Sequence, residues 1–130
     1  MQTVELPQDV IQFITEQIDT VPHLEALLLL FEQPAEQWTF ERAAARLYVS
    51  VDAAVQILQD LERRKLVRKT LDEPASEYVY DPAWDGTGQL MASVAMNYRR
   101  YLAPVAAIIH AKASRSVREF ARAFEFKKDR

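Results

Sequence analysis

The sequence predicts a mostly α-helical fold with a single small β-hairpin, and its patterning and composition support this prediction. Apolar residues recur at intervals of three and four along much of the 130-residue chain, which is the spacing of amphipathic helices. Only two glycines are present, too few for a turn-rich all-β fold. The length is that of one domain, or of one small domain with an appended element.

The first two helices are expected between residues 9 and 34. Residues 9–19 form a short amphipathic helix, because their apolar side chains share one face: Val10, Phe13, Ile14 and Ile18. A second helix starts at Thr20, where Pro22 is tolerated in the first turn, and it ends at Pro34. We expect its strongly apolar face to be central to the core: Leu24, Leu27, Leu28 and Phe31.

Two more helices and the hairpin follow. Residues 38–40 form a short extended stretch, and Thr39 caps a helix over residues 41–48. Ser50 caps the next helix, which runs from Val51 to about Lys65 and buries its apolar positions: Ala54, Ile57, Leu58 and Leu61. Residues 66–70 and 77–81 are predicted strands, because they favour extended structure and turn-forming residues separate them.

A long helical stripe occupies the C-terminal part of the chain, from Met91 to Ile109. Pro104 lies inside this stripe and should kink or break the helix near Tyr101, because proline removes a donor and clashes with the preceding turn. A last helix is expected to open at a capping box that starts at Ser116. Its polar face carries basic residues: Arg115, Arg118 and Arg122.

The predicted elements follow one another in the order helix, short strand, helix, turn, helix and hairpin. Two stretches within this order, WTFERAAARLYVS at 38–50 and AVQILQDLERRKLV at 54–67, resemble the winged-helix family of helix-turn-helix domains, of the bacterial transcriptional-regulator type. Tyr48 stands at the turn position where this family frequently has glycine, and Lys65 does likewise before the wing. The resemblance implies a winged-helix domain over 21–82, an N-terminal amphipathic helix in 1–20 and a C-terminal helical extension over 83–130.

The resemblance also implies binding of duplex DNA, with the helix at 51–65 in the major groove. Three of its outward side chains would face bases: Gln56, Gln59 and Arg63. Six basic residues would face phosphates: Arg42, Arg46, Arg64, Lys65, Arg68 and Lys69. Residues 42–69 hold 7 basic and 3 acidic side chains, which favours a nucleic-acid partner. Two acids expected on the outward face, Asp52 and Asp60, would repel phosphate.

The alternative is a winged-helix module for protein–protein interaction that does not bind DNA. Exposed Val51 and Val55 on the reading helix would fit this alternative. Salt dependence separates the two functions, because binding through several phosphates weakens steeply as salt rises.

The C-terminal stripe is too apolar to stand alone on a small domain, and regulators of this class often dimerise through helices outside the wing domain. The predicted homodimer interface is Met91, Val94, Tyr98, Tyr101, Leu102, Val105, Ile108 and Ile109. Packing of the stripe on the N-terminal helix of the same chain is the alternative. The chain is acidic over 1–97 and basic over 98–130, so the basic last helix could contact DNA, the acidic part or solvent.

Several function classes are not expected. The chain has no cysteine for thiol catalysis or cysteine-ligated metals, and His23 and His110 lie far apart without a ligand-spaced carboxylate. No nucleophile–base pair or glycine-rich phosphate loop is recognised, so we expect no enzyme, cofactor or metal site. Without a signal peptide or a membrane-length apolar run, a cytoplasmic location is expected. A ligand pocket lined by Trp84, Tyr98 and Tyr101 is conceivable, but no residue identifies a ligand.

Overall fold

A computed structural model describes residues 5–71, 76–82 and 87–113. The elements are, in order, α1 (Gln8–Gln17), α2 (Val21–Glu32), α3 (Phe40–Leu47), α4 (Val51–Arg63), β1 (Val67–Leu71), β2 (Glu77–Tyr80) and α5 (Thr87–Arg100). A further helix covers 102–113. Trp84 and the predicted last helix, including Ser116, lie outside the described residues.

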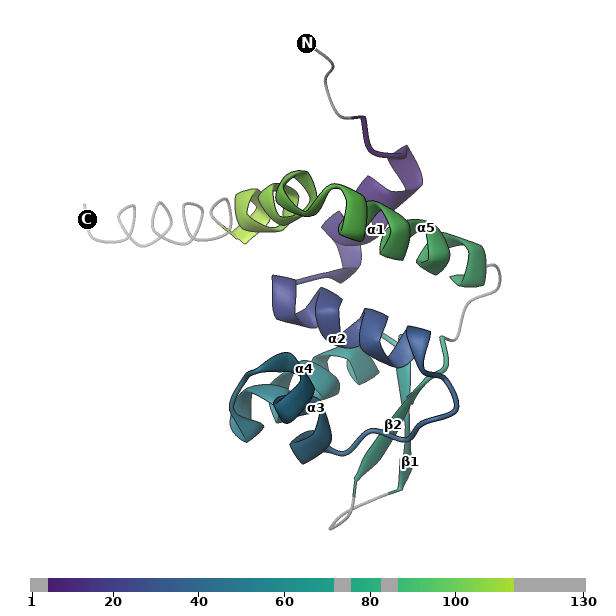
Figure 1. Cartoon of the computed structure of the whole chain (residues 1–130), viewed down its shortest axis with the longest axis vertical. Helices are drawn as coiled ribbons and strands as arrows, with labels where there is room; N and C mark the ends of the chain where they lie inside the picture. The colour runs from purple at the N-terminus through teal and green to yellow at the C-terminus, as the bar shows by residue number, and fades with distance from the viewer. Residues whose placement is uncertain (1–4, 72–75, 83–86, 114–130) are drawn as a thin grey trace, which may run out of the picture.

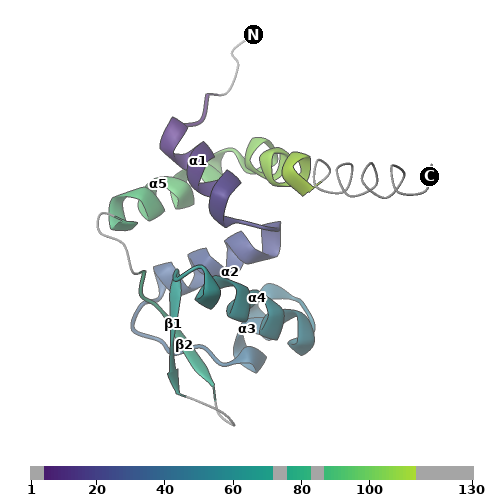
Figure 2. The same ribbon diagram turned by 180° about the vertical axis from the view of Figure 1, so that it is seen from behind.

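Helix α2 lies between two groups of elements, as Figure 1 and Figure 2 show from opposite sides. On one side lie α3, α4 and the hairpin, and on the other lie α1, α5 and the helix at 102–113. α2 contacts α3, α4, β2 and α5. Its residues Leu24, Leu27 and Leu30 are fully buried, which confirms the prediction that this helix is central to the core.

Side-chain caps confirm the predicted starts of α3 and α4. The Thr39 hydroxyl accepts a hydrogen bond from the Arg42 backbone N–H at 3.1 Å. The Ser50 hydroxyl accepts one from the Ala53 N–H, also at 3.1 Å. Each cap satisfies a donor that has no partner within the helix. All four positions predicted to be buried in α4 are buried: Ala54, Ile57, Leu58 and Leu61.

The predicted hairpin is confirmed, with β1 beginning one residue later than expected. β1 and β2 are antiparallel, and Val67 lies opposite Tyr80. Trp38 adds an isolated bridge to Tyr78, in which each backbone N–H donates to the other carbonyl at 2.8 Å. The extended stretch predicted at 38–40 is therefore present at Trp38, although α3 already begins at Phe40.

The predicted break in the C-terminal stripe is present. α5 ends at Arg100, Tyr101 is not helical, and the helix resumes at residue 102. Pro104 has no N–H to donate to the carbonyl of Arg100, so the helical hydrogen-bond ladder is interrupted at this point. Among the described residues, no helix is both long and apolar enough to cross a bilayer.

Candidate nucleic-acid interface

The turn between α3 and α4 sets the direction of the candidate reading helix. Tyr48 adopts the left-handed conformation, with φ 57° and ψ 43°, and its backbone N–H donates to the Ala44 carbonyl. Lys65, at the start of the wing, has φ 62°. Both residues thus stand where the backbone favours glycine, as the resemblance implied. The Tyr48 side chain is 95% exposed, so packing within the described chain does not hold this conformation in place.

The polar side of α4 lies opposite its buried face. Gln56 and Arg63 are exposed and Gln59 is half-buried, so the three side chains predicted to face bases lie on the solvent side of the helix. Val51 and Asp52 are exposed at its N-terminal end. The first turn therefore offers apolar and acidic groups, whereas the basic groups gather at the C-terminal end and on the wing.

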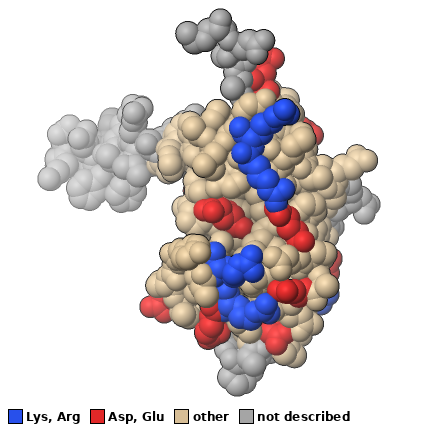
Figure 3. Space-filling view, viewed as in Figure 1, with Lys and Arg blue, Asp and Glu red and all other residues tan. Residues whose placement is uncertain are grey.

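Most of the basic residues predicted to contact phosphates are held by neighbouring side chains. Arg42 pairs with Glu36 at 2.7 Å, and Arg68 pairs with Asp81 at 2.6 Å. The guanidinium groups of Arg42 and Arg46 lie 4.7 and 5.6 Å from the centre of the Trp38 ring, and the Lys69 ammonium lies 5.8 Å from that of Tyr78. Figure 3 shows basic side chains bordering acidic ones on one face of the molecule.

Arg64 is placed differently from the other predicted phosphate contacts. Its guanidinium donates to the Glu16 carbonyl at 2.9 Å and to the Asp19 carboxylate at 2.8 Å. These bonds attach the end of α4 to the last turn of α1 and to the connection that follows it. The expectation that Arg64 faces a phosphate is therefore corrected: its donors are directed to α1 and this connection.

Asp60 is not an outward, phosphate-repelling acid as expected, and its side chain is only 13% exposed. One carboxylate oxygen, Oδ2, lies 2.8 Å from Nε2 of His23 on α2. The other, Oδ1, accepts a hydrogen bond from the Gln56 amide at 2.9 Å and pairs with Arg63. Asp60 thus joins two of the three predicted base-facing residues to α2.

A polar cluster surrounds the His23–Asp60 contact. Nδ1 of His23 lies 2.6 Å from the Thr20 hydroxyl, and Lys112 donates to the Ile18 carbonyl at 2.9 Å. Burial lowers the pKa of His23 and outweighs the opposing effect of nearby Asp19. Burial likewise lowers the pKa of Lys112. Sequence reasoning missed this cluster, because its members are separated by as many as 94 residues.

The same cluster contains the donor set closest to a metal site among the described residues. Asp19, His23 and Asp60 can each offer one ligand atom, and these atoms lie within 4.8 Å of one another. However, Arg64 pairs with Asp19, and Arg63 pairs with Asp60. Both imidazole nitrogens also lie within hydrogen-bonding distance of other side chains. The arrangement therefore fits an ion-pair network that is already balanced by protein cations.

The predicted dimer residues divide into two sets. Met91, Val94, Val105 and Ile109 are no more than 1% exposed, because the chain's own core covers them. We therefore correct their assignment to an interface. The remaining four are exposed or half-buried: Tyr98, Tyr101, Leu102 and Ile108.

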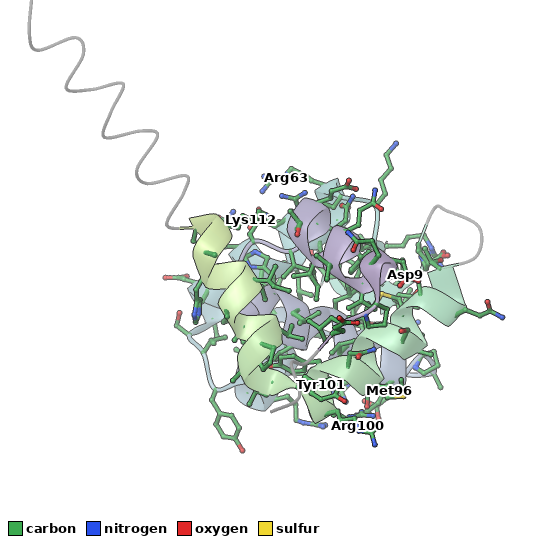
Figure 4. The ribbon with its side chains drawn as sticks, turned by 90° about the horizontal axis from the view of Figure 1, so that it is seen from above. Asp9, Arg63, Met96, Arg100, Tyr101 and Lys112 are labelled. Atoms are coloured by element: carbon green, nitrogen blue, oxygen red, sulfur yellow. The ribbon has the colours of Figure 1, made fainter. Side chains whose placement is uncertain are left out.

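Sequence reasoning missed an apolar groove between α2 and α5. It has a volume of about 450 Å³, and its lining includes Phe31, Ala95 and Met96. Met96 is 55% exposed, as is Leu102. Figure 4 shows Met96, Arg100 and Tyr101 near the junction of α5 with the helix at 102–113. Two large apolar side chains, Met96 and Leu102, are therefore exposed near this junction.

A second hollow, of about 260 Å³, lies between α2, α3 and α5. Tyr98 lines it together with Glu25, Arg46 and Arg99. Burial raises the pKa of Tyr98, and the nearby Glu25 carboxylate adds to this effect. Tyr98 and Tyr101 are the described residues that were expected to line a ligand pocket, and of these two Tyr98 lines this hollow. The charged groups around it indicate no particular ligand.

The chain matches no model of a known protein family and no curated protein by sequence. Several solved structures share its fold. The homodimeric winged helix-turn-helix DNA-binding domain of a possible ArsR-family transcriptional regulator from Mycobacterium bovis matches with a TM-score of 0.53 and 18% identity, over 78% of this chain and 94% of that one.

Two more structures match over more of this chain. MepR of Staphylococcus aureus, in its complex with DNA, has a TM-score of 0.52 and 15% identity, over 94% of this chain and 89% of that one. A MarR family protein from Bacillus stearothermophilus has a TM-score of 0.52 and 18% identity, over 95% and 84%. At these identities the likeness concerns the fold: the chain has the winged helix-turn-helix fold, with a β-hairpin wing and additional helices on both sides.

Proposed function

We propose that this chain binds duplex DNA as a dimeric transcriptional regulator of the cytoplasm, without catalysis, and that α4 enters the major groove. The observation that supports this most is the placement of α4. Its apolar side is buried, whereas Gln56, Gln59 and Arg63 lie on the side turned to solvent. In helix-turn-helix proteins the second helix of the motif reads base edges. The similar fold of MepR, which was crystallised with DNA, supports the same assignment.

We assign the phosphate contacts to Arg42, Arg46, Lys65, Arg68 and Lys69. The ion pairs of Arg42 and Arg68 are about half exposed, and pairs of this kind contribute only about 0.2–1 kcal/mol. A phosphate can therefore replace the carboxylate partner at small cost. The resulting contacts would release counterions and make binding strongly dependent on salt.

We assign the dimer contact to the exposed junction of α5 and the helix at 102–113. It includes Met96, Tyr98, Tyr101, Leu102 and Ile108, of which Met96 and Leu102 are each 55% exposed. A two-fold axis at this junction would hold two copies of α4 at a fixed distance, as reading two half-sites requires. The M. bovis domain, described as homodimeric, supports this proposal.

The test is fluorescence anisotropy with a random-sequence duplex at low and at physiological salt. We expect micromolar binding that weakens steeply with salt. The double substitution Arg68→Ala/Lys69→Ala should weaken binding about tenfold and flatten the salt slope, because it removes two wing charges. The control Arg99→Ala/Arg100→Ala removes two charges from α5 and should have a smaller effect, with light scattering used to verify that it keeps the wild-type mass. Equal losses in the two variants would remove the wing from the mechanism.

A second candidate function is the binding of another protein. It is favoured by the apolar groups at the start of α4, where Tyr48 is 95% and Val51 is 44% exposed. Asp52, beside them, adds a negative charge. If the duplex shows no binding even at low salt, this second function replaces the first.

A further inference from the structure

We propose that Asp60 and His23 form a positioning pair that fixes Gln56 and Arg63 on α4 and thereby sets base-pair discrimination. This inference rests on the proposed function, because it concerns how the reading helix is organised. It adds two positioning residues that would not themselves touch DNA. The pair joins α4 to α2, so it spans two elements of the winged-helix core.

The two carboxylate oxygens of Asp60 have different partners: one faces His23 on α2, and the other faces exposed side chains of α4. Oδ2 lies 2.8 Å from Nε2 of His23, whose side chain is only 9% exposed. Oδ1 accepts from Nε2 of Gln56 at 2.9 Å and pairs with Arg63. The buried contact therefore fixes the carboxylate, and the carboxylate fixes the two exposed side chains.

The hydrogen bond from Gln56 also settles the orientation of its amide. A carboxylate can only accept, so the amide nitrogen must be the atom that faces Asp60. One N–H and the carbonyl oxygen of Gln56 are then left for another partner. These two groups are the pair that a glutamine needs for a bidentate contact with adenine. Asp60 thus orders the amide without using up its reading atoms.

Asp60 also orders Arg63, whose side chain is 67% exposed. An unrestrained arginine loses rotamer freedom when it binds, whereas the Asp60 contact has already restricted this one. Several guanidinium N–H groups remain for the acceptors of guanine. Charged groups outside α2 and the Asp60 contact also influence the pKa of His23: Asp19, Arg64 and Lys112.

Asp60→Asn is the decisive variant. It keeps the size of the side chain, but it removes the charge that holds Arg63 and the acceptor geometry shared with Gln56. Affinity for random duplex DNA should rise, because Asp60 no longer neutralises the positive charge of Arg63. Discrimination between sequences should fall about 5- to 20-fold, because the contacts of two reading residues become less ordered. If Asp60 only stabilised the fold, Asp60→Asn would weaken binding to random duplexes and to preferred sequences together.

Glu62→Gln is the matched control. Glu62 lies on the same end of α4, and its substitution also exchanges a carboxylate for an amide. The Glu62 carboxylate, however, accepts from the Tyr78 hydroxyl at 3.4 Å. Glu62→Gln should raise random-duplex affinity to a similar extent and leave discrimination unchanged.

The measurement is selection from a duplex library with a randomised central segment, followed by sequencing of the bound fraction for the wild type and both variants. We expect the wild type and Glu62→Gln to enrich the same sequences and Asp60→Asn to enrich them weakly. If Asp60→Asn retains the wild-type selection, the positioning role is overturned while the proposed function stands. If the wild type does not bind the library even at low salt, both proposals are overturned.

His23 provides a second test that keeps the Asp60 charge, in case Asp60→Asn does not fold. His23→Leu removes the donor to Asp60, whereas His23→Gln keeps an amide N–H. Discrimination should fall in His23→Leu and be largely restored in His23→Gln, with thermal melting used to verify that both variants are folded. Equal discrimination in the two variants would overturn the role of the His23 contact.

Discussion

Replacement of Tyr48 by glycine should stabilise the protein, because the left-handed backbone at this position is unfavourable for any residue with a Cβ atom. The observed φ of 57° and ψ of 43° place Tyr48 in that region. The cost for an L-residue is about 1–2 kcal/mol. Glycine offsets about 0.5–1 kcal/mol of this stabilisation, because it has more conformational freedom in the unfolded chain, which folding must remove.

The side chain adds little to this balance. Tyr48 is 95% exposed, so its removal uncovers almost no apolar surface within the described chain. The net gain for Tyr48→Gly is therefore about 0.5–1 kcal/mol, which corresponds to a rise in Tm of about 2–4 °C for a chain of this size.

Thermal melting of the wild type, Tyr48→Gly and Tyr48→Ala measures this effect. Tyr48→Ala removes the ring but keeps the Cβ atom, so its Tm should stay near that of the wild type. A Tyr48→Gly variant that melts no higher than Tyr48→Ala would show that the left-handed backbone at this position carries no cost.

Three further results are expected. Leu58→Ala should lower the free energy of unfolding by about 2–5 kcal/mol, measured in urea, because Leu58 is fully buried. Burial lowers the pKa of His23 below 6.5, so folded His23 binds a proton less readily than the unfolded residue, and the free energy of unfolding should decrease as the pH falls below about 6.5. Urea unfolding between about pH 5 and 8 measures this decrease, which should be weaker in His23→Gln. Leu102→Glu should convert a dimer into a monomer in light scattering without a comparable fall in Tm, since Leu102 is 55% exposed; an unchanged mass would exclude Leu102 from the interface.

Local patterns predicted the elements of this fold because their causes are local. The caps at Thr39 and Ser50, the buried face of α4 and the break before Pro104 all depend on residues within one or two helical turns. The left-handed backbone at Tyr48 was implied by the family's turn pattern.

The polar cluster could not be predicted in the same way. His23 meets Asp60 across 37 positions of the chain, and Arg64 meets Asp19 across 45. Helical spacing indicated that Asp60 lies on the outward face of α4, and it gave no sign that His23 would lie beside it. The packing of α2 against α4 brings His23 next to Asp60, and this contact cannot be deduced from the sequence of either helix alone.

The dimer prediction shows a related limit. Periodicity identified the apolar side of the C-terminal stripe, but it cannot tell whether the same chain or a second copy covers that side. Met91 and Ile109 are covered by their own chain, whereas Leu102, after the break, is left outside. Met96 lies off the stripe, so no periodic signal marked it.

DNA reading by α4 is tested most directly by an NMR titration of the isotope-labelled protein with duplex DNA at low salt. We expect the backbone amide signals of α4 around Gln56 and Gln59 and of β1 around Lys69 to shift most, and added salt to reverse these shifts. Shifts confined to α5 and the helix at 102–113, or no shifts at all, would contradict the claim that α4 reads DNA.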